Sequence, residues 1–419
     1  MDCTYTKLNH LHIGMFSWNP KKQNYIELDK RPGKLHDIKA LNESWSKNPF
    51  ELKSESEVPN KLVDFSKPPY GYCYAVPLYA ALQYGCRLEN INFLISGQIL
   101  PSLCLGLWEN PTKYILVQLR KGILILRSMQ TEPYNLNSVG LQIEALLTEN
   151  KTHEEFSSPT ILREISIGKF RVLVNAQVDA INEDEEYCEI KQSSIMSKTI
   201  EKGKMEKSAV FRSDPMPVVN VKKLCIQMIS NGAKILVHPK MNISHEGFKP
   251  KYKISGTHSY SIDEVIEKAD SLSKEYGNEE TVDDILKHAL QTLKILQEYV
   301  DAGNIRSNPR CFYELRINNW STEENGRVSI KPLEKERLLG FFDTSEFMCQ
   351  KLYDSLNDPM KEDDDVFLQN LRELYQGNSK ISEYQRDRLL QEIENANKVY
   401  LTYDFTETLF YRFGNYLMV

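Results

Sequence analysis

The 419-residue sequence lacks the patterns that mark disulfide-rich, zinc-binding and membrane-spanning proteins. Its eight cysteines are scattered and none forms a C-x-x-C pair, which favours reduced thiols in an intracellular protein. Its eight histidines show no H-x-x-x-H or H-E-x-x-H spacing, so we expect no zinc site. No stretch approaches the roughly 18 apolar residues of a membrane span, and the N-terminal residues MDCTYTKLNHLHIGMF contain no apolar run as long as that of a signal peptide. We therefore expect a soluble protein of the nucleus or cytoplasm with no membrane partner.

The sequence also lacks an excess of basic residues. It has 52 Lys and Arg against 58 Asp and Glu, a formal net charge of −6. This balance excludes a protein that coats nucleic acid over its whole surface, because such proteins are usually basic. A locally basic cleft stays open as an alternative. The segment Ser197–Lys223 holds seven Lys or Arg against three Asp or Glu, a local charge of +4, although a solvated surface explains such a run equally well.

The pattern of apolar residues predicts a mixed α/β fold. Hydrophobic residues make up 41% and charged residues 26% of the chain, which is typical of globular proteins. Short apolar runs between breaks over 91–128 predict strands, and residues 19–70 are expected to form loops with short strands. Apolar periodicity and end signals predict helices over 71–86, 139–150, 218–231, 261–274 and 280–301. Residues 322–419 are charged and helix-prone, so we divide the chain into a domain of residues 1–321 and a mainly helical C-terminal extension.

Residues 170–192, FRVLVNAQVDAINEDEEYCEIKQ, are the most informative stretch. Side chains alternate along a strand, so Gln177 and Asp179 share the face opposite the apolar residues of the first predicted strand. Glu189 and Lys191 share one face of the second. A three-residue loop at Glu183–Glu185 would place Asp179 opposite Glu189, and Gln177 opposite Lys191.

Two directly opposed carboxylates destabilise a sheet unless water, a cation or a metal lies between them. Mg²⁺ prefers hard oxygen ligands, and a nearby Lys can stabilise charge on phosphoryl oxygens. The spacing Asp179-x9-Glu189-x-Lys191 therefore resembles the PD-(D/E)xK nuclease signature. An exposed polar hairpin face is the simpler alternative for the same three residues.

Two further polar residues lie on predicted helices among apolar neighbours. Glu144 follows Gly140 in the pattern G-x-x-x-E, and such a carboxylate is either at a solvent edge or held by a cation. Gln227 lies in CIQMISNG, where its amide could bind a phosphate or a water. A satisfied core amide is the commoner explanation for a glutamine in such surroundings.

The order of these motifs resembles the DXO-type decapping exoribonuclease family. G-x-x-x-E is followed by h-x-D, by E-h-K about ten residues on, and by a helix with Q-x-x-x-x-G that leads into a strand. The N-terminal HIGMFSW and the later ILKHALQTLKIL and CFYELRI are also similar to that family. The resemblance covers roughly residues 10–320. It implies two β-sheets flanked by helices, with an active-site cleft between the sheets.

The resemblance also implies roles for particular residues. Glu144, Asp179 and Glu189 would bind Mg²⁺ or Mn²⁺, with the Ile190 carbonyl as a main-chain ligand. Lys191 and Gln227 would be catalytic and would hold the substrate phosphate or the attacking water. The family removes triphosphates, incompletely methylated caps and NAD caps from RNA 5′ ends, and many members then degrade the RNA 5′ to 3′. Some members partner a 5′–3′ exoribonuclease, and DNA is not an expected ligand.

Two positions depart from the family pattern. Gln177 stands where the family usually has Glu, and a Gln accepts hydrogen bonds without contributing charge. Ser96-Gly97 stands where the family has Arg-Gly, and Ser cannot replace a bidentate phosphate ligand. These substrate-binding positions leave a second hypothesis open, a catalytically impaired member that binds an RNA end or a protein. A third hypothesis, a DNA nuclease of restriction type, shares the hairpin chemistry.

Overall fold

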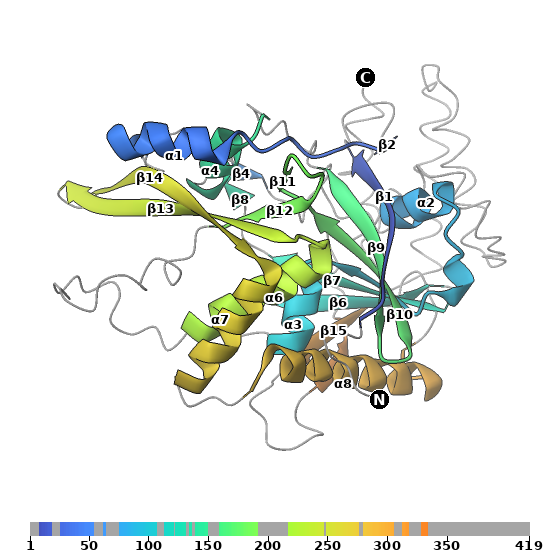
Figure 1. Ribbon diagram of the computed structural model, residues 1–419. Helices are drawn as coiled ribbons and strands as arrows, with labels where there is room; N and C mark the ends of the chain where they lie inside the picture. The colour runs from blue at the N-terminus through green and yellow to red at the C-terminus, as the bar shows by residue number, and fades with distance from the viewer. Residues whose placement is uncertain are drawn as a thin grey trace, which may run out of the picture.

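The computed structural model describes residues 8–18, 26–53, 62–63, 75–106, 113–120, 122–130, 134–135, 139–149, 159–191, 217–246, 249–275, 280–305, 312–317 and 328–333. Two β-sheets form its frame (Figure 1). The larger is a mixed sheet of nine strands. In spatial order these are β16 (Val328–Pro332), β15 (Tyr313–Ile317), β6 (Lys113–Arg120), β7 (Ile123–Gln130), β5 (Phe93–Ser96), β10 (Phe170–Gln177), β9 (Thr160–Ile167), β1 (His10–Trp18) and β2 (Ile26–Leu28).

The smaller sheet has five strands. In spatial order these are β11 (Ala180–Ile181), β12 (Tyr187–Ile190), β13 (Ile235–Glu246), β14 (Lys249–Ser261) and β3 (Phe50–Leu52). A further two-stranded pair joins β4 (Leu62–Val63) to β8 (Tyr134–Asn135). Strands β10 and β11 are consecutive in sequence but belong to different sheets, so residues 178–179 connect the two sheets.

Helices cover both faces of the nine-stranded sheet. The main core lies on one face, where apolar strand residues pack against α3 (Ile99–Leu105), α6 (Pro217–Asn231), α7 (Ile262–Glu275) and α8 (Val282–Asp301). A second core lies on the other face, under α2 (Ala75–Gln83) and beside the 3₁₀ turn Leu88–Asn90. Strand β10 serves both cores because its side chains alternate: Val172 and Val174 face the first, and Leu173 faces the second.

A third core lies on one face of the five-stranded sheet, under α1 (Ile38–Lys47) and α4 (Val139–Leu147). Trp45 of α1 and Ile143 of α4 are buried there against Val237 and Ile254 of the sheet. Figure 1 shows α1 lying along the long β13–β14 ribbon. The predicted mixed α/β fold of two sheets flanked by helices is confirmed.

Two expectations for local structure were wrong. Residues 19–70 contain α1, which begins after the N-cap Asp37, whose side chain accepts the Lys39 and Ala40 N–H groups at 2.9 and 3.1 Å. The stretch around Cys104 was expected to be a strand and forms the end of helix α3. Its buried residues Ile99, Leu100, Leu103 and Cys104 follow helical spacing, a short pattern that cannot be distinguished from a buried strand by periodicity alone.

Both sheets contain strands or parts of strands that the sequence did not predict. The apolar run KILVH at 234–238 predicts a short strand, but β13 runs on to Glu246, and its partner β14 was not predicted. Strand β16 lies beyond residue 321 and pairs with β15, so it belongs to the nine-stranded sheet. The other residues of the predicted extension 322–419, apart from residue 333, lie outside the described chain. Within the described part, no helix has a stretch long and apolar enough to cross a bilayer.

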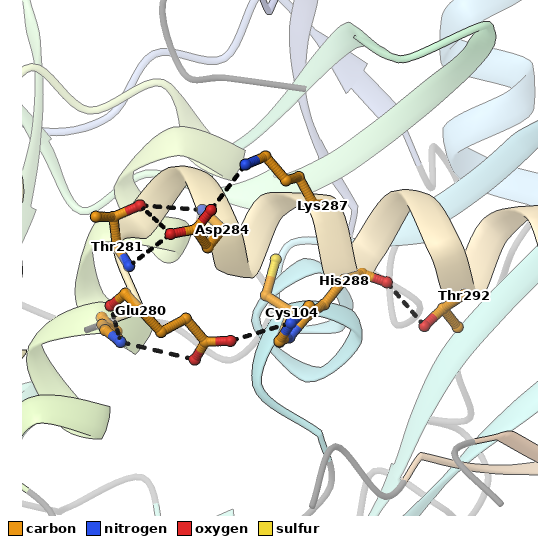
Figure 2. Close-up of polar contacts among 8 residues, drawn as sticks. Cys104, Glu280, Thr281, Asp284, Lys287, His288 and Thr292 are labelled. Carbon is orange, nitrogen blue, oxygen red and sulfur yellow. Dashed lines mark hydrogen bonds and ion pairs between the residues drawn. The ribbon is translucent and has the colours of Figure 1, made fainter. Parts of the chain in front are cut away.

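A buried polar network joins the helices of the main core (Figure 2). Lys222 of α6 was counted in the basic segment, but it is only 1% exposed. Its Nζ donates to the Glu280 carbonyl at 2.5 Å and lies 3.8 Å from the Glu280 carboxylate. That carboxylate lies 3.0 Å from His288 Nε2, and His288 Nδ1 lies 3.2 Å from the Cys104 carbonyl oxygen. The network therefore links α6, α8 and α3, so it fixes the position of α6.

We expect Glu280→Ala to destabilise the fold. The variant removes the carboxylate beside a buried ammonium, a loss of about 1–3 kcal/mol in the free energy of unfolding. Urea denaturation at pH 7 measures it. Glu275→Ala, at the exposed end of α7, is the matched control and should change stability by no more than about 0.5 kcal/mol. Equal effects from the two variants would show that the network contributes nothing to stability.

The contribution of Glu280 should depend on pH. The hydrogen bond from His288, with the nearby charges of His288 and Lys222, holds the pKa of Glu280 below its usual range although burial opposes this. A carboxylate with a lowered pKa stabilises the folded state above its unfolded pKa, and this stabilisation is lost as pH falls through the folded pKa. The difference in stability between wild type and Glu280→Ala should therefore shrink when urea denaturation is repeated at increasingly acidic pH.

Candidate functional site

The predicted hairpin forms where the chain enters the smaller sheet. Strands β11 and β12 pair with Ala180 opposite Cys188 and Ile181 opposite Tyr187. This register, extended by one residue, places Asp179 opposite Glu189 as the sequence predicted. The Asn182 N–H donates to the Glu186 carbonyl at 3.0 Å and closes the three-residue loop Glu183–Glu185. Glu185 has a φ of 60°, the left-handed conformation that three-residue hairpin loops use.

One predicted pairing on this hairpin was wrong. Gln177 does not lie opposite Lys191, because β10 pairs Gln177 with Thr160 in the nine-stranded sheet. The chain leaves that sheet before Asp179, so the two strands expected to be one are divided between two sheets. The Gln177 side chain is exposed, and the main-chain carbonyl oxygen of Gln177 accepts a hydrogen bond from Asn231 Nδ2, at the end of α6, at 3.4 Å.

The Glu189 carboxylate is the centre of the site. The residue is 1% exposed, and both of its carboxylate oxygens accept hydrogen bonds from side-chain amides of α6. Gln227 Nε2 donates to Oε1 at 2.6 Å, and Asn231 Nδ2 donates to Oε2 at 2.7 Å. Lys191 Nζ lies 3.9 Å from Oε1, and the Lys191 side chain is 50% exposed. The site thus joins a buried acid to a cation that reaches solvent.

Asp179 and Glu144 lie within electrostatic reach of Glu189. Asp179 Oδ2 accepts the Ile190 N–H at 2.8 Å. Burial raises the pKa of Asp179 to about 6, although this hydrogen bond and Lys191 oppose the rise. Burial, followed by the charge of Asp179, raises the pKa of Glu189 to about 8 and that of Glu144 to about 9. Lys191 lowers the pKa of each of the three carboxylates, but not enough to cancel the rise.

Helix α4 brings Glu144 to this group. Its Val139, Ile143 and Leu147 are buried against the five-stranded sheet, so the helix is fixed on the sheet that carries Glu189. Glu144 follows Ile143 and is partly buried, and the charges of both other acids raise its pKa. The alternative of an exposed edge glutamate does not fit this position.

The predicted Ser96-Gly97 step lies beside α6. Strand β5 ends with Ser96 paired to Asn175, and the Gly97 N–H donates to the Asn175 carbonyl at 2.8 Å. Ser230 Oγ lies 3.1 Å from the Gly97 carbonyl oxygen and 2.9 Å from that of Gln227. A Cβ at Gly97 would lie 2.6 Å from the Cβ of Ala176, so this close approach requires glycine. Ser230 therefore links the Ser96-Gly97 step to the turn of α6 that carries Gln227, and the substrate-binding role of Ser96 and Gly97 stays a prediction.

Sequence reasoning missed Asn231. It was interpreted only as part of the Asn231-Gly232 helix end, and Gly232 does end α6 with a φ of 77°. Yet Asn231 is 2% exposed and its amide bonds Glu189 directly. Its spacing of four residues from Gln227 puts both amides on one face of α6, and this was the available signal.

The donor set suits a divalent cation chemically. Carboxylate oxygens are the ligands that Mg²⁺ and Mn²⁺ prefer, and a divalent cation would oppose the burial and the neighbouring negative charge that raise the pKa values of Glu144 and Glu189. Among the described residues, however, no group of three or more His, Cys, Asp or Glu side chains is placed to hold a metal as it stands. Each Glu189 oxygen accepts one amide hydrogen bond and has a second lone pair, so a cation could bind the carboxylate beside Gln227 and Asn231. The metal site of Glu144, Asp179, Glu189 and the Ile190 carbonyl stays a prediction.

Comparison with known proteins identifies the fold. No family model and no curated protein sequence matches the chain. A mutant of Rai1 from S. pombe, solved with 3′-FADP, matches with a TM-score of 0.54 and 13% sequence identity, over 80% of this chain and 96% of that one. Rai1 from S. pombe without the mutations matches over the same shares with a TM-score of 0.52 and 13% identity. Dxo1 from K. lactis, solved with manganese, covers 80% of this chain and 92% of its own, with 15% identity and a TM-score of 0.48. The resemblance suggested by the motifs is thus confirmed at the level of the fold, and the chain is built on the fold of S. pombe Rai1.

Proposed function

We propose that the protein is a metal-dependent hydrolase that acts on RNA 5′ ends. The observation that carries the proposal is the group of three acids with raised pKa values around one partly exposed lysine. Perturbed carboxylates beside a cation are a common property of catalytic sites. The fold shared with Rai1, which was solved with the dinucleotide-type ligand 3′-FADP, supports a substrate made of nucleotides and phosphates.

Each residue has a distinct role in this proposal. Mg²⁺ or Mn²⁺ would supply Lewis-acid chemistry at a phosphorus atom. Glu144, Asp179 and Glu189 would hold the cation, with the Ile190 carbonyl as a fourth ligand. Lys191 reaches solvent, so its ammonium can stabilise charge that develops on phosphoryl oxygens. Gln227 would orient the substrate phosphate or the attacking water.

The finer parts of the proposal concern substrate and cellular setting. We infer that the substrates are faulty 5′ ends, namely triphosphates, incompletely methylated caps or NAD caps, removed in RNA quality control. A 5′–3′ exoribonuclease is the protein partner that such a role suggests, and the nucleus or cytoplasm is the expected location. DNA is not an expected substrate.

A second candidate function is an RNA-end or protein binding module with little catalysis. The observation that favours it is the hydrogen bonding of Glu189, because each of its oxygens already accepts an amide N–H and has less capacity left for a cation. Gln177 and Ser96 add to it, because they remove one negative and one positive charge from the family pattern. The following three experiments separate the candidates.

Purified protein with Mn²⁺ should cleave at least one of four 5′-labelled RNAs, which carry a triphosphate, an NAD cap, an unmethylated cap or a monophosphate. Glu189→Gln should lower the rate about 100-fold or more, because it removes a charged ligand from the cation. Glu183→Gln, in the exposed loop of the same hairpin, should leave the rate unchanged. If wild type leaves all four RNAs intact, the hydrolase proposal fails and the binding module gains support.

Binding of Mn²⁺ should strengthen as pH rises. The raised pKa values of Asp179, Glu189 and Glu144, about 6, 8 and 9, mean that protons occupy the acids at low pH and must leave when a cation binds. Calorimetric titration should show at least about tenfold tighter binding at pH 8.5 than at pH 6. Asp179→Asn should lose most of the binding. Affinity that is constant with pH would contradict the predicted ligands.

Asn231→Ala should raise the pH at which Mn²⁺ binding is half complete. Without its amide, ionised Glu189 loses one of the two hydrogen bonds that lower its pKa, so protons compete better for the carboxylate. The free energy of unfolding should also fall by about 1–3 kcal/mol, since Glu189 stays buried. Asn242→Ala, an exposed amide on β13, is the control and should change neither quantity. An unchanged binding profile would show that Asn231 acts only on stability.

A further inference from the structure

The last turn of α6 contacts both sheets. Its Gln227 and Asn231 amides donate to Glu189 of the five-stranded sheet at 2.6 and 2.7 Å. The same turn also contacts the nine-stranded sheet, where Arg163 of β9 donates from Nη1 to the Ile229 carbonyl at 2.7 Å and to the carbonyl of the next residue at 3.4 Å. Both carbonyls lie between the two amide residues in the chain. Arg163 therefore bonds the stretch of backbone that carries both amides.

Arg163 faces α6 because side chains alternate along β9. Ile161 and Ile165, two residues to either side of it, are buried in the main core on the face that α6 covers. A charged group on such an apolar face costs free energy unless its donors are bonded. The end of α6 meets this need, since the last carbonyls of a helix have no partner within it and carry a partial negative charge.

Gly232 allows the guanidinium to lie against the end of the helix. This glycine has a φ of 77°, and a Cβ on it would lie 2.7 Å from both Cζ and Nη1 of Arg163 and 2.9 Å from Nε. Three atoms of one planar group at nearly equal distances mean that its face, rather than its edge, is turned toward Gly232. A lysine ammonium has no such face, so the fit is specific to arginine.

A second contact joins this turn to the nine-stranded sheet. Ser230 Oγ lies 3.1 Å from the Gly97 carbonyl oxygen, at the end of β5. That hydrogen bond joins two neutral groups, whereas the donor from Arg163 is charged, and charge-assisted hydrogen bonds are roughly twice as strong. Arg163 is therefore the stronger of these two links between the turn and the larger sheet.

We propose that Arg163 is a positioning residue for the acid site. By fixing the last turn of α6 on the nine-stranded sheet, it sets where the Gln227 and Asn231 amides stand, and so how the Glu189 carboxylate is oriented toward a cation. That this orientation affects metal binding and cleavage rests on the proposed function, whereas the placement of the amides does not.

The side-chain amide signals of Gln227 and Asn231 in ¹H–¹⁵N spectra of the full chain in EDTA test the placement. Spectra of the two alanine variants assign the signals. In Arg163→Met both signals should move toward those of solvent-exposed amides. Arg171→Met is the matched control, because Arg171 on the neighbouring strand β10 bonds the buried Glu164 at 2.6 and 2.7 Å on the other face of the sheet. It should leave both signals in place.

Binding of Mn²⁺ tests the consequence for the site. Arg163→Met should weaken it about tenfold or more, the effect typical of losing a residue that orients a metal ligand. Arg163→Lys keeps the cation at the helix end but not the planar group, so its affinity should lie between those of wild type and Arg163→Met. Arg171→Met should bind Mn²⁺ as wild type does, even where urea denaturation shows that it has lost as much stability as Arg163→Met.

The proposal is overturned if the two amide signals stay in place in Arg163→Met, or if Arg171→Met moves them equally. It is also overturned if Mn²⁺ affinity falls equally in the two methionine variants. If Arg163→Met does not fold, the spectra of Arg163→Lys decide, and unmoved signals there overturn the proposal. Moved signals in a protein that neither binds Mn²⁺ nor cleaves RNA would contradict only the hydrolase, and unmoved signals in an active enzyme only the role of Arg163.

Discussion

The burial of the Glu189 carboxylate is the constraint on which the site depends. A carboxylate that is 1% exposed must have its oxygens satisfied, and two amides from the last turns of α6 do this. This requirement fixes where α6 lies over the smaller sheet. The Lys222 network fixes the same helix from its other end, through α8 and α3 (Figure 2). The two ends of α6 are thus held by polar groups, and the apolar residues between them fill the main core.

The connection between the sheets explains why the acids meet. Residues 178–179 carry the chain out of the nine-stranded sheet and directly into β11. Asp179 stands at this crossing, beside Glu189 on β12 and under the end of α6. Glu144 comes from α4, which covers the other face of the hairpin's sheet. The β11–β12 hairpin therefore contributes two of the acids and helix α4 the third, and the packing of α4 on the sheet holds them together.

The three acids affect both the stability of the folded protein and the chemistry of the site. Burial raises the pKa values of all three acids, the charge of Asp179 raises those of Glu144 and Glu189 further, and Lys191 offsets the rise only in part. In the structure, two side-chain amides and one backbone N–H donate hydrogen bonds to Glu189 and Asp179. A divalent cation would bind the carboxylates more strongly and would release the protons that they hold. The same residues can thus form either a stable network without a metal or a metal site, with the amides of Gln227 and Asn231 orienting the Glu189 carboxylate in both.

The sequence by itself determined the features that depend on local spacing. Alternation along a strand and the length of the Glu183–Glu185 loop were enough to place Asp179 opposite Glu189, because both are properties of neighbouring residues. Only the tertiary structure decided which sheet each strand joined. It placed Gln177 beside Thr160 rather than Lys191, buried Lys222 of the basic segment, and turned Asn231 from a helix end into a partner of Glu189. The physical reason is that pairing between distant strands and burial under a helix depend on residues far apart in the chain, which no local pattern contains.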